Sequence, residues 1–283
     1  MRSDIDTLIH NHTVPLEPIP TGMTPRGTLE APRYAVLFDV YGTLFISKAG
    51  DISIARKEAD VHVHDIDRLL QRYNIAKEAA SLGDELFEEI ERDKDSRKAD
   101  GVEYPEVVIE DIWKRVLDIE DSELLLRFAL EYELIVNPVY PMPHVKEIFA
   151  ACREKGIVMG IISNAQFYTP LLFSALMGAT LEALGFRRDL IFFSYMTGHG
   201  KPSLHLFEKA VDRLGELRIS TKNALYVGND MLKDIYPAHS AGLQTVLFAG
   251  DKRSLRLRED DKRCRGLEAD LIVTDFRQLL RYL

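Results

Sequence analysis

The sequence predicts an α/β protein built on a doubly wound parallel sheet, with an all-helical insertion after the first strand. Three observations predict this fold. Short apolar runs that end in polar residues alternate with amphipathic helical patterns over residues 138–283. A further apolar run, residues 35–45, carries a single carboxylate, Asp39. Residues 47–137 between them contain helical patterns and almost no strand pattern. Strands that alternate with helices form right-handed crossovers and therefore a parallel sheet.

The composition is that of an ordinary soluble globular protein. The 283 residues are 46% hydrophobic and 29% charged, and the net charge is −9. A nucleic-acid-binding protein needs a basic stripe to meet phosphates, so this charge argues against that class. The basic run over residues 252–265 is interleaved with acidic residues, and we interpret it as a solvated loop or helix face.

Targeting signals and cysteine usage favour the cytoplasm. No apolar run reaches the roughly 18 residues of a transmembrane helix, and the N-terminus lacks the apolar core of a signal peptide. Cys152 and Cys264 form no C-x-x-C pattern, which fits two unpaired thiols in a reducing compartment. We expect neither a membrane nor a nucleic-acid partner, and the sequence leaves the oligomeric state open.

Composition divides the chain into three parts. Residues 1–32 contain five prolines and little periodicity, which predicts an extended arm on the surface. Residues 33–46 and 138–283 form the predicted sheet domain, and residues 47–137 form the helical insertion. In the insertion, apolar residues of 108–117 recur at spacings of three and four, and Leu82, Leu86 and Ile90 form a second stripe. Ser122 is the expected N-cap of the next helix.

After residue 138 the elements of the sheet domain follow in order. Pro143 opens a helix that ends at Gly156. We predict strands at 157–162, 190–193, 224–227, 244–248 and 271–273. Helices precede and follow the 224–227 strand, the second of them at 232–241.

Polar residues appear where successive predicted strands stop. They are Asp39, Ser163 with Asn164, Lys201, and Asp230 with Asp234. Parallel strands bring their carboxyl ends to one edge of the sheet, where open α/β proteins bind ligands. Asp39 and Asp230 together suit a hard cation such as Mg²⁺. Lys201 suits the neutralisation of a nucleophilic carboxylate or of a phosphoryl group, and Ser163 suits contact with phosphoryl oxygens.

These segments resemble the motifs of the haloacid dehalogenase-like hydrolase superfamily, in the family's order. Residues 39–44 (DVYGTL) resemble the first motif, 162–164 (ISN) the second, 200–202 (GKP) the third and 228–234 (GNDMLKD) the fourth. The resemblance covers residues 33–46 and 138–283. It implies a Rossmann-like core, and the inserted helices match the family's helical cap.

The resemblance also implies roles for single residues. Asp39 would be the nucleophile that forms a covalent aspartyl intermediate. Thr43 and Ser163 would contact the transferred group, and Lys201 would steady its charge. Asn164 would belong to the same catalytic set. Asp39, Asp230 and the backbone carbonyl of Tyr41 would ligate Mg²⁺, with Asp234 as a direct or outer partner of the metal.

Position 41 departs from the phosphatase pattern. Phosphatases of this superfamily usually carry a second Asp two residues after the nucleophile, as the acid and base for the leaving group. Here that residue is Tyr41, and the resulting Asp-x-Tyr-Gly-Thr-Leu is similar to the 2-haloacid dehalogenase branch. A halide leaves without a proton, so that branch needs no acid at this position. The cluster His62-x-His64-Asp65-x-Asp67 is one candidate for a replacement acid, and the alternative is a solvated helix end.

The fourth motif favours the opposite interpretation. The dehalogenase branch has an amide-bearing residue where this chain has Asp230. Three crowded aspartates, with Lys201 as the only counter-charge in view, would repel one another unless a cation binds. The sequence therefore predicts an enzyme that hydrolyses the phosphate monoester of a small metabolite with Mg²⁺. The alternatives are hydrolysis of a carbon–halogen bond and a catalytically weak module that binds a phosphorylated ligand or a protein.

Overall fold

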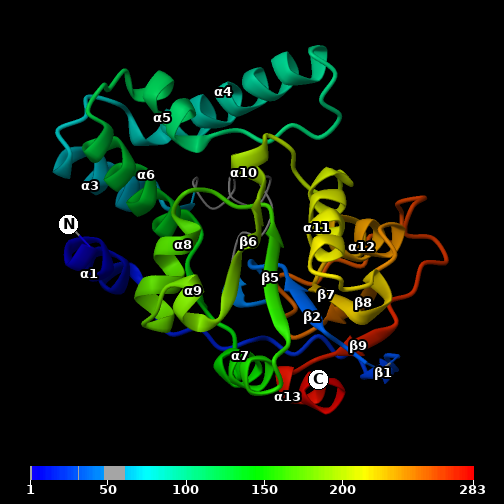
Figure 1. Cartoon of the computed structure of the whole chain (residues 1–283). Helices are drawn as coiled ribbons and strands as arrows, with labels where there is room; N and C mark the ends of the chain where they lie inside the picture. Colours follow the sequence, from blue (N-terminus) through cyan, green and yellow to red (C-terminus); the bar gives the residue numbers. More distant parts are fainter. Residues whose placement is uncertain (1, 31, 48–60) are drawn as a thin grey trace.

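The computed structural model describes residues 2–30, 32–47 and 61–283, and it confirms the predicted fold class (Figure 1). A seven-stranded sheet has the order β1-β9-β8-β7-β2-β5-β6. Every neighbouring pair in it is parallel except β1 with β9. Its strands are β1 (Arg26–Gly27), β2 (Ala35–Phe38), β5 (Val158–Ser163), β6 (Phe186–Phe193), β7 (Ala224–Gly228), β8 (Gln244–Phe248) and β9 (Leu271–Val273).

Helices cover both faces of this sheet. Alternate residues of its central strand β2 point to opposite sides, and both sets are apolar and buried. Phe38 lies in the hydrophobic cluster on one face, with its ring edge-on to Phe149 at 6.1 Å between centroids. Leu37 lies in the cluster of the other face, together with Phe207. The helices are α7 (Val145–Glu154), α8 (Thr169–Leu172), α9 (Leu181–Leu184), α10 (Ser194–Thr197), α11 (His205–Glu216), α12 (Tyr236–Ser240) and α13 (Phe276–Leu279).

Short π and 3₁₀ turns join these elements: η1 (Phe173–Met177), η2 (Thr221–Asn223), η3 (Met231–Ile235) and η4 (Leu280–Tyr282). The strands predicted at 244–248 and 271–273 match β8 and β9. Strand β6 begins at Phe186, four residues before its predicted start. The sequence did not predict the two-stranded sheet of β3 (Phe45–Ser47) and β4 (Val139–Pro141), because three residues are too few to show a strand period.

The described residues of the insertion form the helices α3 (Val63–Arg72), α4 (Ala79–Ala99), α5 (Ile109–Leu117) and α6 (Ser122–Val136). They lie over one end of the sheet, with α4 and α5 at the top of Figure 1. They pack around a hydrophobic cluster of their own, in which the Trp113 ring lies 5.1 Å from Phe128 and 4.7 Å from Tyr132. No helix among the described residues has the length and hydropathy needed to cross a bilayer.

The predicted N-cap of α6 is wrong by one residue. Asp121 is the N-cap, and its carboxylate accepts hydrogen bonds from the backbone N–H groups of Glu123 and Leu124 at 3.0 and 3.1 Å. Ser122 is the first helical residue. Both residue types are good caps, but the carboxylate also interacts favourably with the helix dipole.

The predicted extended arm is also wrong for the first residues of the chain, which form helix α1 (Arg2–His12). The five prolines all lie beyond this helix. Ile5, Leu8 and Ile9 follow helical spacing and pack on the main hydrophobic cluster, where Ile9 is fully buried. Three apolar residues on one face were too weak a sequence pattern to outweigh the prolines that follow.

Truncation of Ile9 to alanine should lower the free energy of unfolding by about 2–5 kcal/mol, because it opens a cavity in a fully buried position. Urea denaturation monitored by circular dichroism measures this change. Ile19→Ala is the matched control, since its side chain is 45% exposed and its loss should cost under about 0.5 kcal/mol. Equal effects of the two substitutions would show that α1 does not dock on the core.

Candidate active site

The loop after β2 places Asp39 at the carboxyl edge of the sheet. The N–H of Asp39 donates to the carbonyl of Val227 on the neighbouring strand at 2.9 Å. The chain then turns tightly, with three successive N–H groups donating to the carbonyl of Val40. Gly42 has a φ of +88°, and a Cβ on it would lie 2.6 Å from side-chain atoms of Asn229 and Ser254. Glycine is therefore required at this position.

One oxygen of the Asp39 carboxylate is fixed and the other is not. Oδ1 accepts hydrogen bonds from Ser163 Oγ at 2.8 Å and from Lys201 Nζ at 2.7 Å. Oδ2 accepts none from the residues that the structure describes, although the side chain is only 8% exposed. The structure thus brings three of the predicted site residues together and leaves one carboxylate oxygen available for chemistry.

Lys201 joins two carboxylates at the centre of the site. Its buried Nζ donates to Asp39 Oδ1, to Asp234 Oδ1 at 2.5 Å and to the Tyr226 hydroxyl at 3.1 Å. Burial acts to lower the pKa of Lys201, but the charges of Asp234 and Asp39 outweigh it and raise the pKa above its ordinary value. The ammonium group is therefore charged at neutral pH.

Asn164 fixes the backbone of Lys201 instead of facing the reacting atoms. The N–H of Lys201 donates to Asn164 Oδ1 at 2.7 Å, and Asn164 Nδ2 donates to the Lys201 carbonyl at 3.2 Å. This pair of bonds holds the loop of Lys201 against the end of β5.

Two further predicted residues shape the loop after β7. Asp234 Oδ2 accepts the N–H groups of Asn229 and Asp230, both at 2.9 Å, while its Oδ1 is bound to Lys201. Both of its oxygens are therefore occupied, which fits a positioning role better than direct metal ligation.

Thr43 was expected to contact the transferred group. It has no exposed surface here, and it donates to Asn229 Oδ1 at 3.1 Å.

Asp230 has a partner that the sequence did not predict. Arg258 Nη2 donates to Asp230 Oδ2 at 2.6 Å, and its Nε lies 3.2 and 3.1 Å from the two carboxylate oxygens. The interpretation of residues 252–265 as a solvated face is thus wrong for Arg258. Lys201 is not the only counter-charge of the three aspartates, so their repulsion is a weaker argument for a metal than the sequence indicated.

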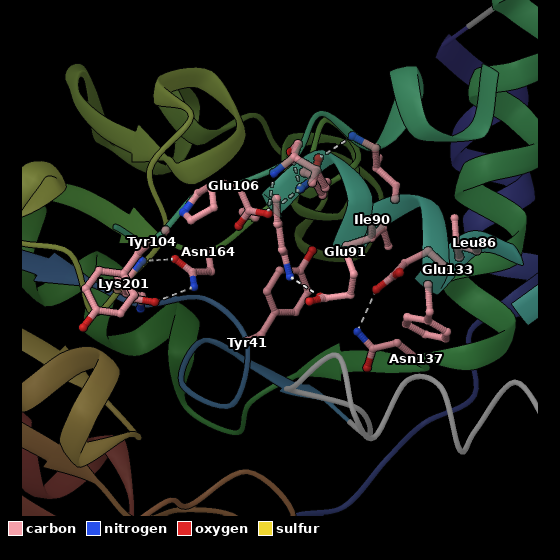
Figure 2. Close-up of a pocket in the computed structure, with 18 of the residues that line it drawn as sticks. Tyr41, Leu86, Ile90, Glu91, Tyr104, Glu106, Glu133, Asn137, Asn164 and Lys201 are labelled. Carbon is pink, nitrogen blue, oxygen red and sulfur yellow. Dashed lines mark hydrogen bonds and ion pairs between the residues drawn. The ribbon is translucent and has the colours of Figure 1, made fainter. Parts of the chain in front are cut away.

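A cavity of about 520 Å³ opens from this site toward the insertion. Figure 2 shows Lys201 and Asn164 at one end, Glu133 and Leu86 at the other, and Tyr41 between them. The insertion supplies most of an apolar wall, which includes Leu86, Phe87, Ile90, Val107, Trp113 and Val136. His62, considered as a replacement acid, is not among the described residues that line the cavity.

Two acidic residues of the cavity were missed by sequence reasoning. Glu106 accepts a hydrogen bond from Ser194 Oγ at 2.8 Å, and Glu133 accepts one from Asn137 Nδ2 at 2.8 Å. Burial raises the pKa of both carboxyl groups. The one available signal was Glu133, a charged residue within the largely apolar run of helix α6.

Tyr41 lines the cavity, and its hydroxyl shares a hydrogen bond of 2.8 Å with Thr169 Oγ1. Burial, followed by the negative charge of Glu133, raises the pKa of Tyr41 far above its ordinary value. A phenol with such a pKa is a poor proton donor at neutral pH. The raised pKa therefore argues against Tyr41 as the replacement for an aspartic acid at this position.

The insertion is joined to the loop that carries Lys201 by two backbone hydrogen bonds. The N–H of Glu106 donates to the carbonyl of Gly198 at 3.0 Å, and the N–H of Gly200 donates to the carbonyl of Tyr104 at 2.8 Å. Arg263 Nη1 also donates to the Tyr104 hydroxyl at 2.6 Å. The apolar wall and the lysine are consequently held in fixed relation.

The residues predicted to hold Mg²⁺ were tested for fit. Asp39 Oδ2 is available, and the backbone carbonyl of Tyr41 accepts none of the hydrogen bonds of its turn among the described residues. Oxygens without a hydrogen-bond partner are the kind of ligand that a hard cation takes. No cluster of three or more His, Cys, Asp or Glu side chains with metal-binding geometry occurs in the described residues, but this set needs only two side chains. The Asp39 and Tyr41 oxygens fit Mg²⁺. Both Asp230 oxygens already accept hydrogen bonds, so a cation there would have to displace Arg258 from at least one of them.

Comparisons with known proteins show the family to which the chain is similar. Residues 35–242 match the family described as haloacid dehalogenase-like hydrolase. A glyceraldehyde 3-phosphate phosphatase of Methanocaldococcus jannaschii is 27% identical over 80% of this chain and 89% of its own length. A ribulose-1,5-bisphosphate 5-phosphatase of Halopiger xanaduensis is 30% identical over 49% of this chain, which spans about half (54%) of that relative.

Solved structures share the fold at low sequence identity. A dehalogenase superposes with a TM-score of 0.52 at 17% identity, covering 90% of this chain and 99% of the other. The HAD phosphatase from Thermococcus onnurineus gives 0.52 at 22% identity, covering 87% and 96%. The matched family spans β2 to the end of α12 and contains every predicted site residue. The chain belongs to the haloacid dehalogenase-like hydrolase family.

Proposed function

We propose that this chain is a Mg²⁺-dependent phosphatase that hydrolyses the phosphate monoester of a small metabolite. The observation that carries the proposal is the Asp39 carboxylate, with Oδ1 held by Ser163 and Lys201 and Oδ2 left without a partner among the described residues. The named sequence relatives are phosphatases of small phosphorylated compounds, which favours this activity over dehalogenation.

In the proposed mechanism, Asp39 Oδ2 attacks the phosphorus atom and the bond to the leaving oxygen breaks, giving an aspartyl phosphate and an alkoxide that takes its proton from water. Water then attacks this phosphorus, which releases phosphate and restores Asp39. Lys201 and Ser163 hold the opposite oxygen, which fixes the orientation of the carboxylate and leaves Oδ2 as the attacking atom. Asp39, the Tyr41 carbonyl and Asp230 would hold Mg²⁺, which supplies charge stabilisation for the phosphoryl oxygens when bound.

We further propose that residues 47–137 act as a cap that excludes water from the reaction. The apolar wall contributed by α4, α5 and α6 supports this role. The wall and the transferred group would lie at opposite ends of the cavity, so the leaving alcohol would contact the cap.

Carbon–halogen hydrolysis is the second candidate, and two observations favour it. Tyr41 occupies the position of the usual acid, and Arg258 neutralises Asp230 without a metal. Turnover of p-nitrophenyl phosphate and of a 2-chloroalkanoate, each with and without Mg²⁺, separates the candidates. Phosphatase activity that requires Mg²⁺ supports the proposal. Halide release in EDTA with no phosphatase activity would reject it, and inactivity on both would favour a binding module.

Tyr41→Asp should raise kcat/KM for alkyl phosphates by about 10-fold or more and leave that for aryl phosphates nearly unchanged. An alkoxide needs a proton in order to leave, and a general acid typically contributes about 10²–10⁴-fold, whereas a phenolate leaves readily without one. The measurement is the alkyl-to-aryl ratio of kcat/KM at saturating Mg²⁺.

Tyr41→Phe is the control for this substitution, because it removes the bond to Thr169 without adding an acid. Its alkyl-to-aryl ratio should equal that of the wild type. A flat or falling ratio for a folded Tyr41→Asp variant would count against phosphatase chemistry.

A further inference from the structure

The ion pair between Arg258 and Asp230 is built into the site. Arg258 lies on the segment between β8 and β9, outside the four motifs. Its guanidinium group meets both oxygens of Asp230, and the side chains are 28% and 8% exposed. An ion pair with one nearly buried partner is screened less by solvent than a surface pair.

The backbone around Arg258 is fixed to the loop that carries Asp230. The N–H of Arg256 donates to the carbonyl of Asn229 at 3.0 Å, and the N–H of Met231 donates to the carbonyl of Arg256 at 2.8 Å. Asn229 Nδ2 also donates to the carbonyl of Ser254 at 2.6 Å. The backbone of the segment therefore places Arg258 next to Asp230.

A cation bound to Asp230 would lie close to the positive charge of Arg258. Mg²⁺ requires a carboxylate oxygen at about 2.0–2.1 Å in near-octahedral geometry. Both Asp230 oxygens accept hydrogen bonds from Arg258, and Oδ1 also accepts the N–H groups of Leu232 and Lys233. A guanidinium group a few ångströms from a divalent cation repels it through a poorly screened interior.

We propose that Arg258 is an internal counter-ion of Asp230, which neutralises this carboxylate in the metal-free protein and thereby weakens Mg²⁺ binding. The inference rests on the metal site of the proposed function. A residue that orients a metal ligand normally increases the affinity for the metal. Arg258, in contrast, would decrease the affinity for Mg²⁺. The sign of the effect therefore separates the two roles.

Isothermal titration with MgCl₂ on the full chain tests the proposal. Arg258→Gln, which keeps hydrogen-bonding capacity but removes the charge, should bind Mg²⁺ about 10-fold more tightly than the wild type. Its metal-free form should unfold at a lower temperature, because Asp230 loses its counter-charge. Arg253→Gln is the matched control, since Arg253 lies on the same segment but pairs with Asp251 at 3.0 Å. Its Mg²⁺ affinity should equal that of the wild type.

Asp230→Asn helps to distinguish failure of the role of Arg258 from failure of the proposed Mg²⁺ site. It should abolish Mg²⁺ binding both alone and combined with Arg258→Gln. Equal or weaker Mg²⁺ affinity of Arg258→Gln, in a protein whose wild type binds Mg²⁺, would overturn the role of Arg258 alone. Absence of Mg²⁺ binding in both the wild type and Arg258→Gln would overturn this inference together with the metal dependence of the proposed function.

Discussion

Asp39→Asn is expected to reduce turnover by about 10⁴-fold or more while the protein remains folded. A carboxamide has nearly the shape of the carboxylate and can still accept hydrogen bonds from Ser163 and Lys201 at Oδ1. It cannot attack as an anion, and loss of a nucleophile in other hydrolases costs factors of this size. Steady-state kinetics and thermal unfolding measure the two effects.

Asp270→Asn provides the control for Asp39→Asn. Among the described residues, the Asp270 side chain accepts hydrogen bonds only from Thr245, at 2.7 and 2.8 Å, whereas Asp39 accepts them from Ser163 and Lys201. This variant should keep the turnover of the wild type. Activity of Asp39→Asn within 10-fold of the wild type would mean that another residue is the nucleophile.

Lys201→Met is expected to destabilise the protein by about 3–5 kcal/mol and also to abolish turnover. Lys201 is the ammonium partner of two buried carboxylates, and removal of one member of a buried ion pair leaves an uncompensated charge. Because the pKa of Lys201 is raised in the folded protein, its contribution is present at pH 7 and is lost only as the pH rises through that raised pKa. Urea denaturation at pH 7 measures the loss.

A second substitution tests this explanation. Asp234→Asn in the Lys201→Met background removes one of the two stranded charges, and it should restore part of the lost stability without restoring turnover. Lys222→Met is the control for the loss of an exposed lysine and should change stability by under about 0.5 kcal/mol. A loss in Lys201→Met no larger than that of the control would contradict the buried ion-pair network.

The residues found from the sequence are those whose placement depends on local pattern. Asp39, Ser163 and Asp230 follow apolar runs, and a parallel sheet gathers the ends of such runs whatever the connections between them. Family resemblance supplied their proposed roles. The local sequence pattern thus suffices to place Asp39, Ser163 and Asp230 at the same edge of the sheet.

The residues that the sequence did not predict depend on contacts between segments that are distant in the chain. Arg258 reaches Asp230 because the segment after β8 folds back onto the loop after β7, and no local pattern encodes that return. Helix α1 is specified by contacts with distant parts of the core, including η1. In the same way, Thr43 was assigned to the substrate from its motif, whereas packing buries it against Asn229.

The two backbone hydrogen bonds between residues 104–106 and 198–200 have a consequence for evolution. Main-chain atoms make these bonds, so the side chains of α4, α5 and α6 can diverge without breaking them. A lineage can thereby acquire a new leaving-group preference through drift in the insertion while Lys201 stays where it is. The same ancestral reaction centre can in this way serve many descendants with different substrates.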